Sequence, residues 1–143
     1  MNKIFKISLV FIFGIAIGYY INYINIIDDI FSSYYKAFQV GVYTNYDAAI
    51  TYSSKYSNSI IVRDNELYRV YVSILKNKDN IESMSNYLDK LGIEYYLKEI
   101  SVDNKEIKSK IDDYESLMNS ESEIVFLELN KMIIDTYKES LWN

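Results

Sequence analysis

Two short segments in which apolar and polar residues alternate constrain the fold of this chain most. They are 38–43, Phe-Gln-Val-Gly-Val-Tyr, and 67–72, Leu-Tyr-Arg-Val-Tyr-Val. A period of two is typical of β-strands that pack one face against a core and leave the other face free. The sequence therefore predicts a sheet with a valine-rich covered face and a free face that carries an amide, tyrosines and an arginine.

The segments between and after these strands indicate helices and further strands. The expected elements are strands 35–43, 59–63, 67–74 and 93–102, a helix after Thr44 or Asn45, and a second helix that begins at Asn77 or Asp79 and ends at Gly92. The order βαββαβ is typical of a ferredoxin- or RNP-like α+β fold, a four-stranded antiparallel sheet with two helices on one face. We expect these helices to cover the face of Val40, Val42, Val70 and Val72.

The composition excludes several kinds of chemistry. The 143 residues contain neither cysteine nor histidine, which removes thiol chemistry, disulfides, zinc sites and imidazole bases. The net charge is −5 and no basic stripe occurs, so nucleic acid is not an expected partner. We expect no metal site, no cofactor, and one folded domain with small additions.

Residues 7–27 form a largely apolar run near the start of the chain. About 20 residues suffice for one helix to cross a bilayer. Lys3 and Lys6 precede the run, Asp28 and Asp29 follow it, and positive residues stay on the cytoplasmic side. We therefore predict a single-pass anchor in the cell membrane, with a cytoplasmic N-terminus and the remaining chain outside the cytoplasm.

The apolar run has alternative interpretations. A cleaved signal peptide has a similar composition, but the run is long for a signal core and no clear Ala-x-Ala site follows it. Gly14 and Gly18 form a GxxxG pair, which indicates either close packing of two anchors or small residues without that role. The predicted organisation is 1–27 for the cytoplasmic stub and anchor and 28–34 for a short linker.

Four segments of the central region resemble one family in their order and spacing. They are 38–43, 45–49, 67–72 and 88–92. They are similar to the aromatic-x-Val-Gln-Val-Gly-x-Phe opening, the Asn-x-x-x-Ala helix start, the Tyr-Arg-Val-x-Val strand and the second-helix ending of the SPOR domain. This resemblance covers 35–102, and SPOR domains are peptidoglycan-binding modules of bacterial cell-division and sporulation proteins.

The resemblance implies a ligand and a binding surface. SPOR domains bind glycan strands that lack stem peptides, which are enriched at division septa, and their ligand contacts lie on the open sheet face. The residues implied as glycan-binding here are Gln39, Tyr43, Leu67, Arg69, Tyr71 and Ser73. The alternative interpretation of Tyr43 and Tyr71 is a cross-strand aromatic pair that stabilises the sheet by under about 1 kcal/mol.

Residues 103–143 extend beyond the resembling region and are predicted to be helical. Two capping boxes indicate two helix starts, Asp103 with Glu106 and Ser120 with Glu123. The second helix, 121–142, is apolar on more than one side, and such a helix is buried or meets a partner. It packs against the central domain, covers the sheet or binds another protein, and the sequence leaves these three open.

Two acidic pairs have the composition of a glycosidase site, Asp112 with Asp113 and Glu121 with Glu123. No cleft pattern surrounds them, so we interpret them as solvated surface and expect no enzyme activity. Our first hypothesis is a membrane-anchored, extracytoplasmic protein that recognises denuded septal glycan in cell division or sporulation. The alternative is a protein–protein interaction module of a division or sporulation membrane complex that has lost glycan binding.

Overall fold

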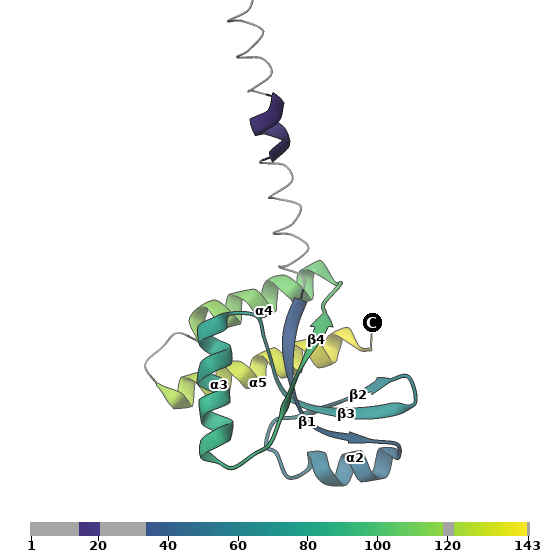
Figure 1. The fold of residues 1–143 in the computed structure, drawn as a ribbon. Helices are drawn as coiled ribbons and strands as arrows, with labels where there is room; N and C mark the ends of the chain where they lie inside the picture. Colours follow the sequence, from purple (N-terminus) through teal and green to yellow (C-terminus); the bar gives the residue numbers. More distant parts are fainter. Residues whose placement is uncertain (1–14, 21–33, 119–121, 143) are drawn as a thin grey trace, which may run out of the picture. The chain divides into compact units, whose positions relative to one another are not determined.

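The computed structural model of the protein describes residues 15–20, 34–118 and 122–142 (Figure 1). The chain divides into two compact units, Met1–Ser33 and Tyr34–Asn143. In the first unit 15–20 are helical, and the rest of the predicted anchor and nearly all of the predicted linker lie outside the described residues. Among the helices of the described residues, none combines the length and the apolar character that a membrane crossing requires.

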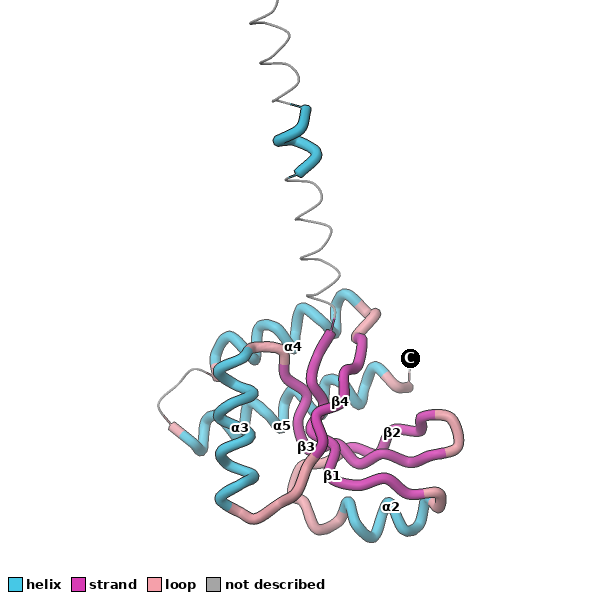
Figure 2. The backbone as a smooth tube through the Cα atoms, in the orientation of Figure 1, coloured by secondary structure: helices cyan, strands magenta, loops and turns pink. Residues whose placement is uncertain are grey.

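The second unit begins with the predicted βαββαβ order and adds two helices. Its elements are β1 (Tyr34–Tyr43), α2 (Tyr46–Ser53), β2 (Ile60–Asp64), β3 (Leu67–Leu75), α3 (Lys78–Lys90), β4 (Tyr96–Ser101), α4 (Lys105–Leu117) and α5 (Glu123–Ser140). The strands form one sheet in the order β2-β3-β1-β4, and each neighbouring pair is antiparallel (Figure 2). The predicted α+β class with a four-stranded antiparallel sheet is confirmed.

The starts and ends of the first helices follow from single residues. The side chain of Asn45 accepts a hydrogen bond of 2.7 Å from the backbone N–H of Asp47 and so caps α2. Asn77 caps α3 in the same way. Gly92 follows α3 with a φ of 66°, a conformation that glycine adopts without a Cβ clash. These three predictions are confirmed, with Asn77 as the cap rather than Asp79.

The later elements begin at other residues than predicted. The final strand begins at Tyr96 rather than at Ile93. The cap of α4 is Asn104 rather than Asp103, because Asn104 directly precedes the helix and its oxygen accepts from the backbone N–H groups of Glu106 and Ile107. Ser122 occupies the N-cap of α5 without a side-chain hydrogen bond, and the predicted cap Ser120 lies outside the described residues.

The two helices of the extension are part of the core of the second unit. In Figure 1, α5 passes behind the strands, and it contacts β3 and α4. Ile133 is fully buried and Ile134 and Tyr137 nearly so, which places one side of α5 against the sheet. Of the three alternatives for this helix, packing against the central domain and covering part of the sheet are therefore confirmed.

Carboxylates of α4 connect it to the sheet and to α3. Glu115 is buried, and its Oε1 accepts from the backbone N–H groups of Lys76 and Asn77 at 2.8 and 2.6 Å, at the start of α3. Burial raises the pKa of Glu115, and these two hydrogen bonds oppose that rise. Asp112 accepts a hydrogen bond of 2.5 Å from the Tyr35 hydroxyl. Asp112 therefore has a structural contact, rather than belonging to the purely solvated surface that we predicted.

Candidate functional site

Each of the four strands contributes one polar side chain to a single cluster. Arg69 on β3 donates from Nε to Oδ2 of Asp64 on β2 at 2.7 Å, and from Nη1 to Oε1 of Gln39 on β1 at 2.8 Å. Lys98 on β4 forms an ion pair with the same Asp64 oxygen. We call Gln39, Asp64, Arg69 and Lys98 the four-strand cluster. It joins residues that are up to 59 positions apart in the sequence, and it is built only when the whole sheet forms.

The position of Asp64 follows from the turn between β2 and β3. Asp64 is paired with Leu67, so only two residues connect the strands. The first of them, Asn65, has a φ of 57°, which asparagine tolerates better than most residues. The tight turn holds the Asp64 carboxylate on the face of the sheet that carries Leu67 and, two residues further, Arg69.

The position of Gln39 follows from an irregular register between β1 and β3. Phe38 is paired with Ser73 and Gly41 with Val70, so a regular ladder would place Gln39 opposite Val72. The register instead shifts on both sides of Gln39 and pairs it with Tyr71. A bulge of this kind changes the direction of a side chain. Here it turns the side chain of Gln39 to the face of the sheet that carries Arg69.

The four-strand cluster is half-buried and carries an excess of positive charge. The side chains of Arg69, Lys98 and Asp64 are 20%, 27% and 32% exposed. The hydrogen bonds from Lys98 and Arg69 lower the pKa of the Asp64 carboxyl below its usual value, so the carboxylate stays ionised. Two cations surround one anion, and Nη2 of Arg69 has no hydrogen-bond partner among the described residues. A polar or anionic ligand therefore has donors available here.

An exposed aromatic ring adjoins the four-strand cluster. Tyr96 is paired with Gln39 across β1 and β4, and it is 65% exposed. Lys98 lies two residues further along β4, on the same face. Val42 is paired with Arg69 and is also exposed. The surface thus offers one flat ring and one small apolar side chain around a group of hydrogen-bond donors.

Only part of the implied glycan-binding set is brought together. Gln39 and Arg69 meet directly, and Leu67 lies beside them, half-buried. Tyr43 lies elsewhere: it is paired with Tyr68, and its ring packs on Tyr52 of α2 at 5.4 Å between centroids. The prediction that Tyr43 shares the open face with Arg69 is wrong.

The register explains why this prediction failed. Val42, not Tyr43, is opposite Arg69, and Gly41 is opposite Val70. The expectation that Val42 and Val70 share one covered face is therefore also wrong. A Cβ at Gly41 would lie 2.7 Å from the ring of Tyr43, so the space above this glycine is filled by the chain's own tyrosine.

Tyr71 and Ser73 are buried rather than accessible. The exposed fractions of the two residues are 1% and 0%. Ser73 Oγ donates to Asn130 Oδ1 of α5 at 2.6 Å, and Asn130 Nδ2 donates to the backbone oxygen of Val72 at 2.9 Å. Burial raises the pKa of Tyr71 to about 12. The prediction that both residues lie on an open face is wrong, because α5 covers this part of β3.

Tyr96, Lys98 and Asp64 belong to the site although the sequence did not single them out. The sequence contained a signal for Tyr96 and Lys98, because they are two positions apart in the predicted last strand and therefore share a face. Asp64 lies directly after the predicted strand 59–63, and no binding role was predicted for it. Nothing local to Tyr96 and Lys98 shows that β4 lies beside β1, so the pairing of Tyr96 with Gln39 and the ion pair of Lys98 with Asp64 could not be predicted from the sequence.

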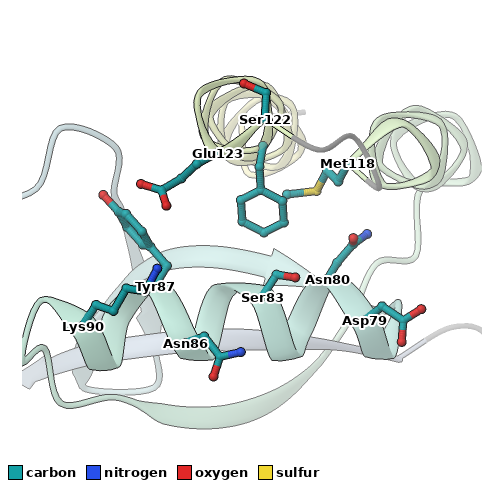
Figure 3. Close-up of a pocket in the computed structure, with 10 residues that line it drawn as sticks. Asp79, Asn80, Ser83, Asn86, Tyr87, Lys90, Met118, Ser122 and Glu123 are labelled. Carbon is teal, nitrogen blue, oxygen red and sulfur yellow. The ribbon is translucent and has the colours of Figure 1, made fainter.

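Other concave regions occur in the described part of the second unit. A cleft of about 490 Å³ lies between α3 and the start of α5, and Figure 3 shows Tyr87 and Lys90 on one side of it with Glu123 on the other. A second cavity of about 550 Å³ lies at the β2 edge, beside Trp142. The described residues contain no group of acidic side chains that could hold a metal ion.

Comparisons with known proteins found little. No family model matches this sequence, and neither does any curated protein. One solved structure with some likeness is the solution structure of the peptidoglycan-binding domain of the cell wall lytic enzyme CwlC of B. subtilis. It is 24% identical, with 48% of this chain and 90% of that domain covered, at a TM-score of 0.39. A TM-score of this size does not establish a common fold.

Proposed function

We propose that the protein binds peptidoglycan, and that it recognises glycan strands without stem peptides through the four-strand cluster and Tyr96. The observation that carries this proposal is the group of half-buried donors on Gln39, Arg69 and Lys98 beside an exposed ring. The resemblance of 35–102 to the SPOR domain points to the same ligand and to the same pair, Gln39 and Arg69.

The chemistry of the ligand fits these side chains. A sugar ring has an apolar C–H face edged with hydroxyls, and a tyrosine ring such as Tyr96 provides a matching flat surface with one polar end. The amide nitrogen of Gln39 can donate to an acetamido carbonyl while its oxygen stays bonded to Arg69. The lactyl group of a denuded muramic acid is a carboxylate, and Arg69 and Lys98 supply charge-assisted donors for it.

The proposal extends to the cellular context and to the absence of catalysis. The apolar run 7–27 and the lysines before it support a membrane anchor with the second unit outside the cytoplasm, at septa in division or sporulation. Hydrolysis of a glycosidic bond needs two carboxyl groups, one of which must be protonated. Asp64 is the only carboxylate of the four-strand cluster, and its pKa is lowered, which supports binding without hydrolysis.

The test is sedimentation of the full chain with purified sacculi from which an amidase has removed the stem peptides. We expect the binding affinity to fall roughly ten- to hundredfold in Arg69→Ala and in Lys98→Ala, since a charge-assisted hydrogen bond contributes about 1.5–3 kcal/mol. Lys131→Ala is the matched control, because Lys131 is an exposed lysine on α5. Equal retention of all variants would refute the site, and release of soluble sugar fragments would identify an enzyme.

The burial of Tyr71 and Ser73 favours a second candidate function. These are two of the residues that the resemblance implies as glycan contacts, and α5 removes both from the surface. A SPOR-like sheet altered in this way suits a protein–protein interaction module in a division or sporulation membrane complex. The same sedimentation separates the two, because this alternative predicts no retention of the folded protein on denuded sacculi.

A further inference from the structure

A cavity of about 550 Å³ at the edge of β2 is lined by side chains from three elements that are distant in sequence. Tyr46 comes from the start of α2, Tyr68 and Arg63 from the β2–β3 hairpin, and Trp142 from the residues that follow α5. We call it the tryptophan groove. Its volume lies within the range of about 300–1,000 Å³ that small-ligand sites have.

The two tyrosine rings of the groove are held in place by contacts within the chain. Tyr46 and Tyr68 pack on each other with their centroids 5.2 Å apart, and the guanidinium of Arg63 lies 6.0 Å from the Tyr68 centroid. Trp142, in contrast, is 82% exposed. An exposed tryptophan beside a fixed tyrosine pair gives two aromatic surfaces, one of which has no cover among the described residues.

The groove adjoins the four-strand cluster. Val62 lines the groove, and it is the residue of β2 that is paired with Arg69. Neighbouring strands are about 4.8 Å apart, so one row crosses the sheet from Val42 through Arg69 to Val62 and ends at the groove. A ligand long enough to follow this row reaches the groove at Val62, at the edge of the sheet.

We propose that the tryptophan groove is a second subsite for the same carbohydrate, in which a sugar ring lies against Trp142 and the tyrosine pair. This inference rests on the proposed function, since it assigns the far end of the same glycan strand. Aromatic rings bind the apolar face of a pyranose, and the tyrosine hydroxyls and Arg63 can form hydrogen bonds with the hydroxyls at its edge. Nucleic acids also stack on aromatic rings, but they are polyanions, and a chain of net charge −5 is unsuited to them. A glycan is a linear polymer, so contiguous subsites increase the affinity for it.

Trp142 is the only tryptophan of the chain, so the tryptophan emission reports on the surroundings of this one residue. The experiment adds chitotetraose, a soluble oligomer of N-acetylglucosamine, to the full chain in mild detergent and records the emission. We expect a saturable blue shift, because a stacked sugar removes water from the indole. A parallel titration uses the free stem peptide, and a shift with the peptide in place of the sugar would overturn the proposal.

Variants distinguish this subsite from the four-strand cluster. We expect Tyr46→Ala and Trp142→Ala to weaken binding to denuded sacculi roughly three- to tenfold, the range of one aromatic contact, and Trp142→Phe to restore most of it. Ile124→Ala is the control, because Ile124 is 76% exposed on α5 and lies 18 residues from Trp142, about 27 Å along a helix. Intact folding of each variant is verified by its circular dichroism.

The two proposals fail in different ways. If sacculi bind and depend on Arg69 but the emission of Trp142 does not change, the groove is not a subsite and the proposed function stands. If chitotetraose shifts the emission while Arg69→Ala and Lys98→Ala bind sacculi normally, the groove is supported and the four-strand cluster is refuted. If neither sacculi nor chitotetraose bind, both proposals are wrong.

Discussion

The two ends of β3 differ in accessibility although their sequences are alike. Leu67 and Arg69 at one end alternate with apolar residues, and so do Tyr71 and Ser73 at the other. Arg69 reaches the surface and joins the four-strand cluster, whereas Ser73 is fully buried against Asn130 of α5. Alternation therefore predicts where side chains point within a strand, while a helix from another part of the chain determines which of them stay accessible.

The largest expected effect concerns the covered end of β3, where Tyr71 and Ser73 lie beneath α5. Ile133 is fully buried on α5, and Ile133→Ala should lower the free energy of unfolding by about 2–5 kcal/mol, since it removes buried methyl groups and leaves a cavity. Met132→Ala is the neighbouring control, because Met132 is 43% exposed and should change stability by under about 0.5 kcal/mol. Urea unfolding measures both. Equal, small effects would show that α5 is not part of the core.

A smaller effect is expected from the polar contacts of the covered end. Asn130→Ala removes the partner of the Ser73 hydroxyl and of the Val72 carbonyl, and an unsatisfied buried polar group costs about 1–3 kcal/mol. Ser73→Ala should then cost less in the Asn130→Ala background than in the wild type. A double-mutant cycle in urea yields this coupling, and a value of zero would contradict the contact.

The smallest effect concerns the accessible end of β3, where Arg69 contacts Asp64. This effect depends on pH. The pKa of Asp64 is lowered in the folded state by Lys98 and Arg69, so its contribution to stability is present above the pKa of the unfolded carboxyl and is lost as the pH falls through the folded-state pKa. The stability difference between wild type and Asp64→Asn should therefore be present at about pH 7 and be smaller at about pH 2.

Thermal unfolding at both pH values measures this difference. The control is Asp113→Asn, because Asp113 is exposed on α4 and has no ion pair among the described residues. A difference for Asp64→Asn that grows toward acid would contradict the direction of its pKa shift.

Much of the secondary structure could be predicted because its causes are local. Asn45 and Asn77 cap the helices that follow them, and Gly92 ends α3, since each acts on backbone groups within a few residues. The pairing of Gln39 with Tyr71 could not be predicted in this way. It depends on register shifts between β1 and β3, which are separated by α2 and β2 in the chain.

The residues of the candidate site likewise fall into those that could be predicted from local motifs and those that depend on how the strands pair. Gln39 and Arg69 were identified in advance from the motifs that carry them, and the structure brings them together. Tyr43 was misplaced because a change of one residue in register reverses the face of a side chain. Tyr96 and Lys98 enter the site because β4 is the neighbour of β1.

Local alternation, caps and turn residues of this chain thus determine that it forms a four-stranded antiparallel sheet with helices between the strands. The tertiary structure alone determines that α5 buries Tyr71 and Ser73, and that Gln39, Asp64, Arg69 and Lys98 of four different strands meet in one cluster. The physical reason is that hydrogen bonds within a turn or a helix end involve near neighbours in sequence. Burial and cross-strand contacts are shared by residues that only the folded chain brings together.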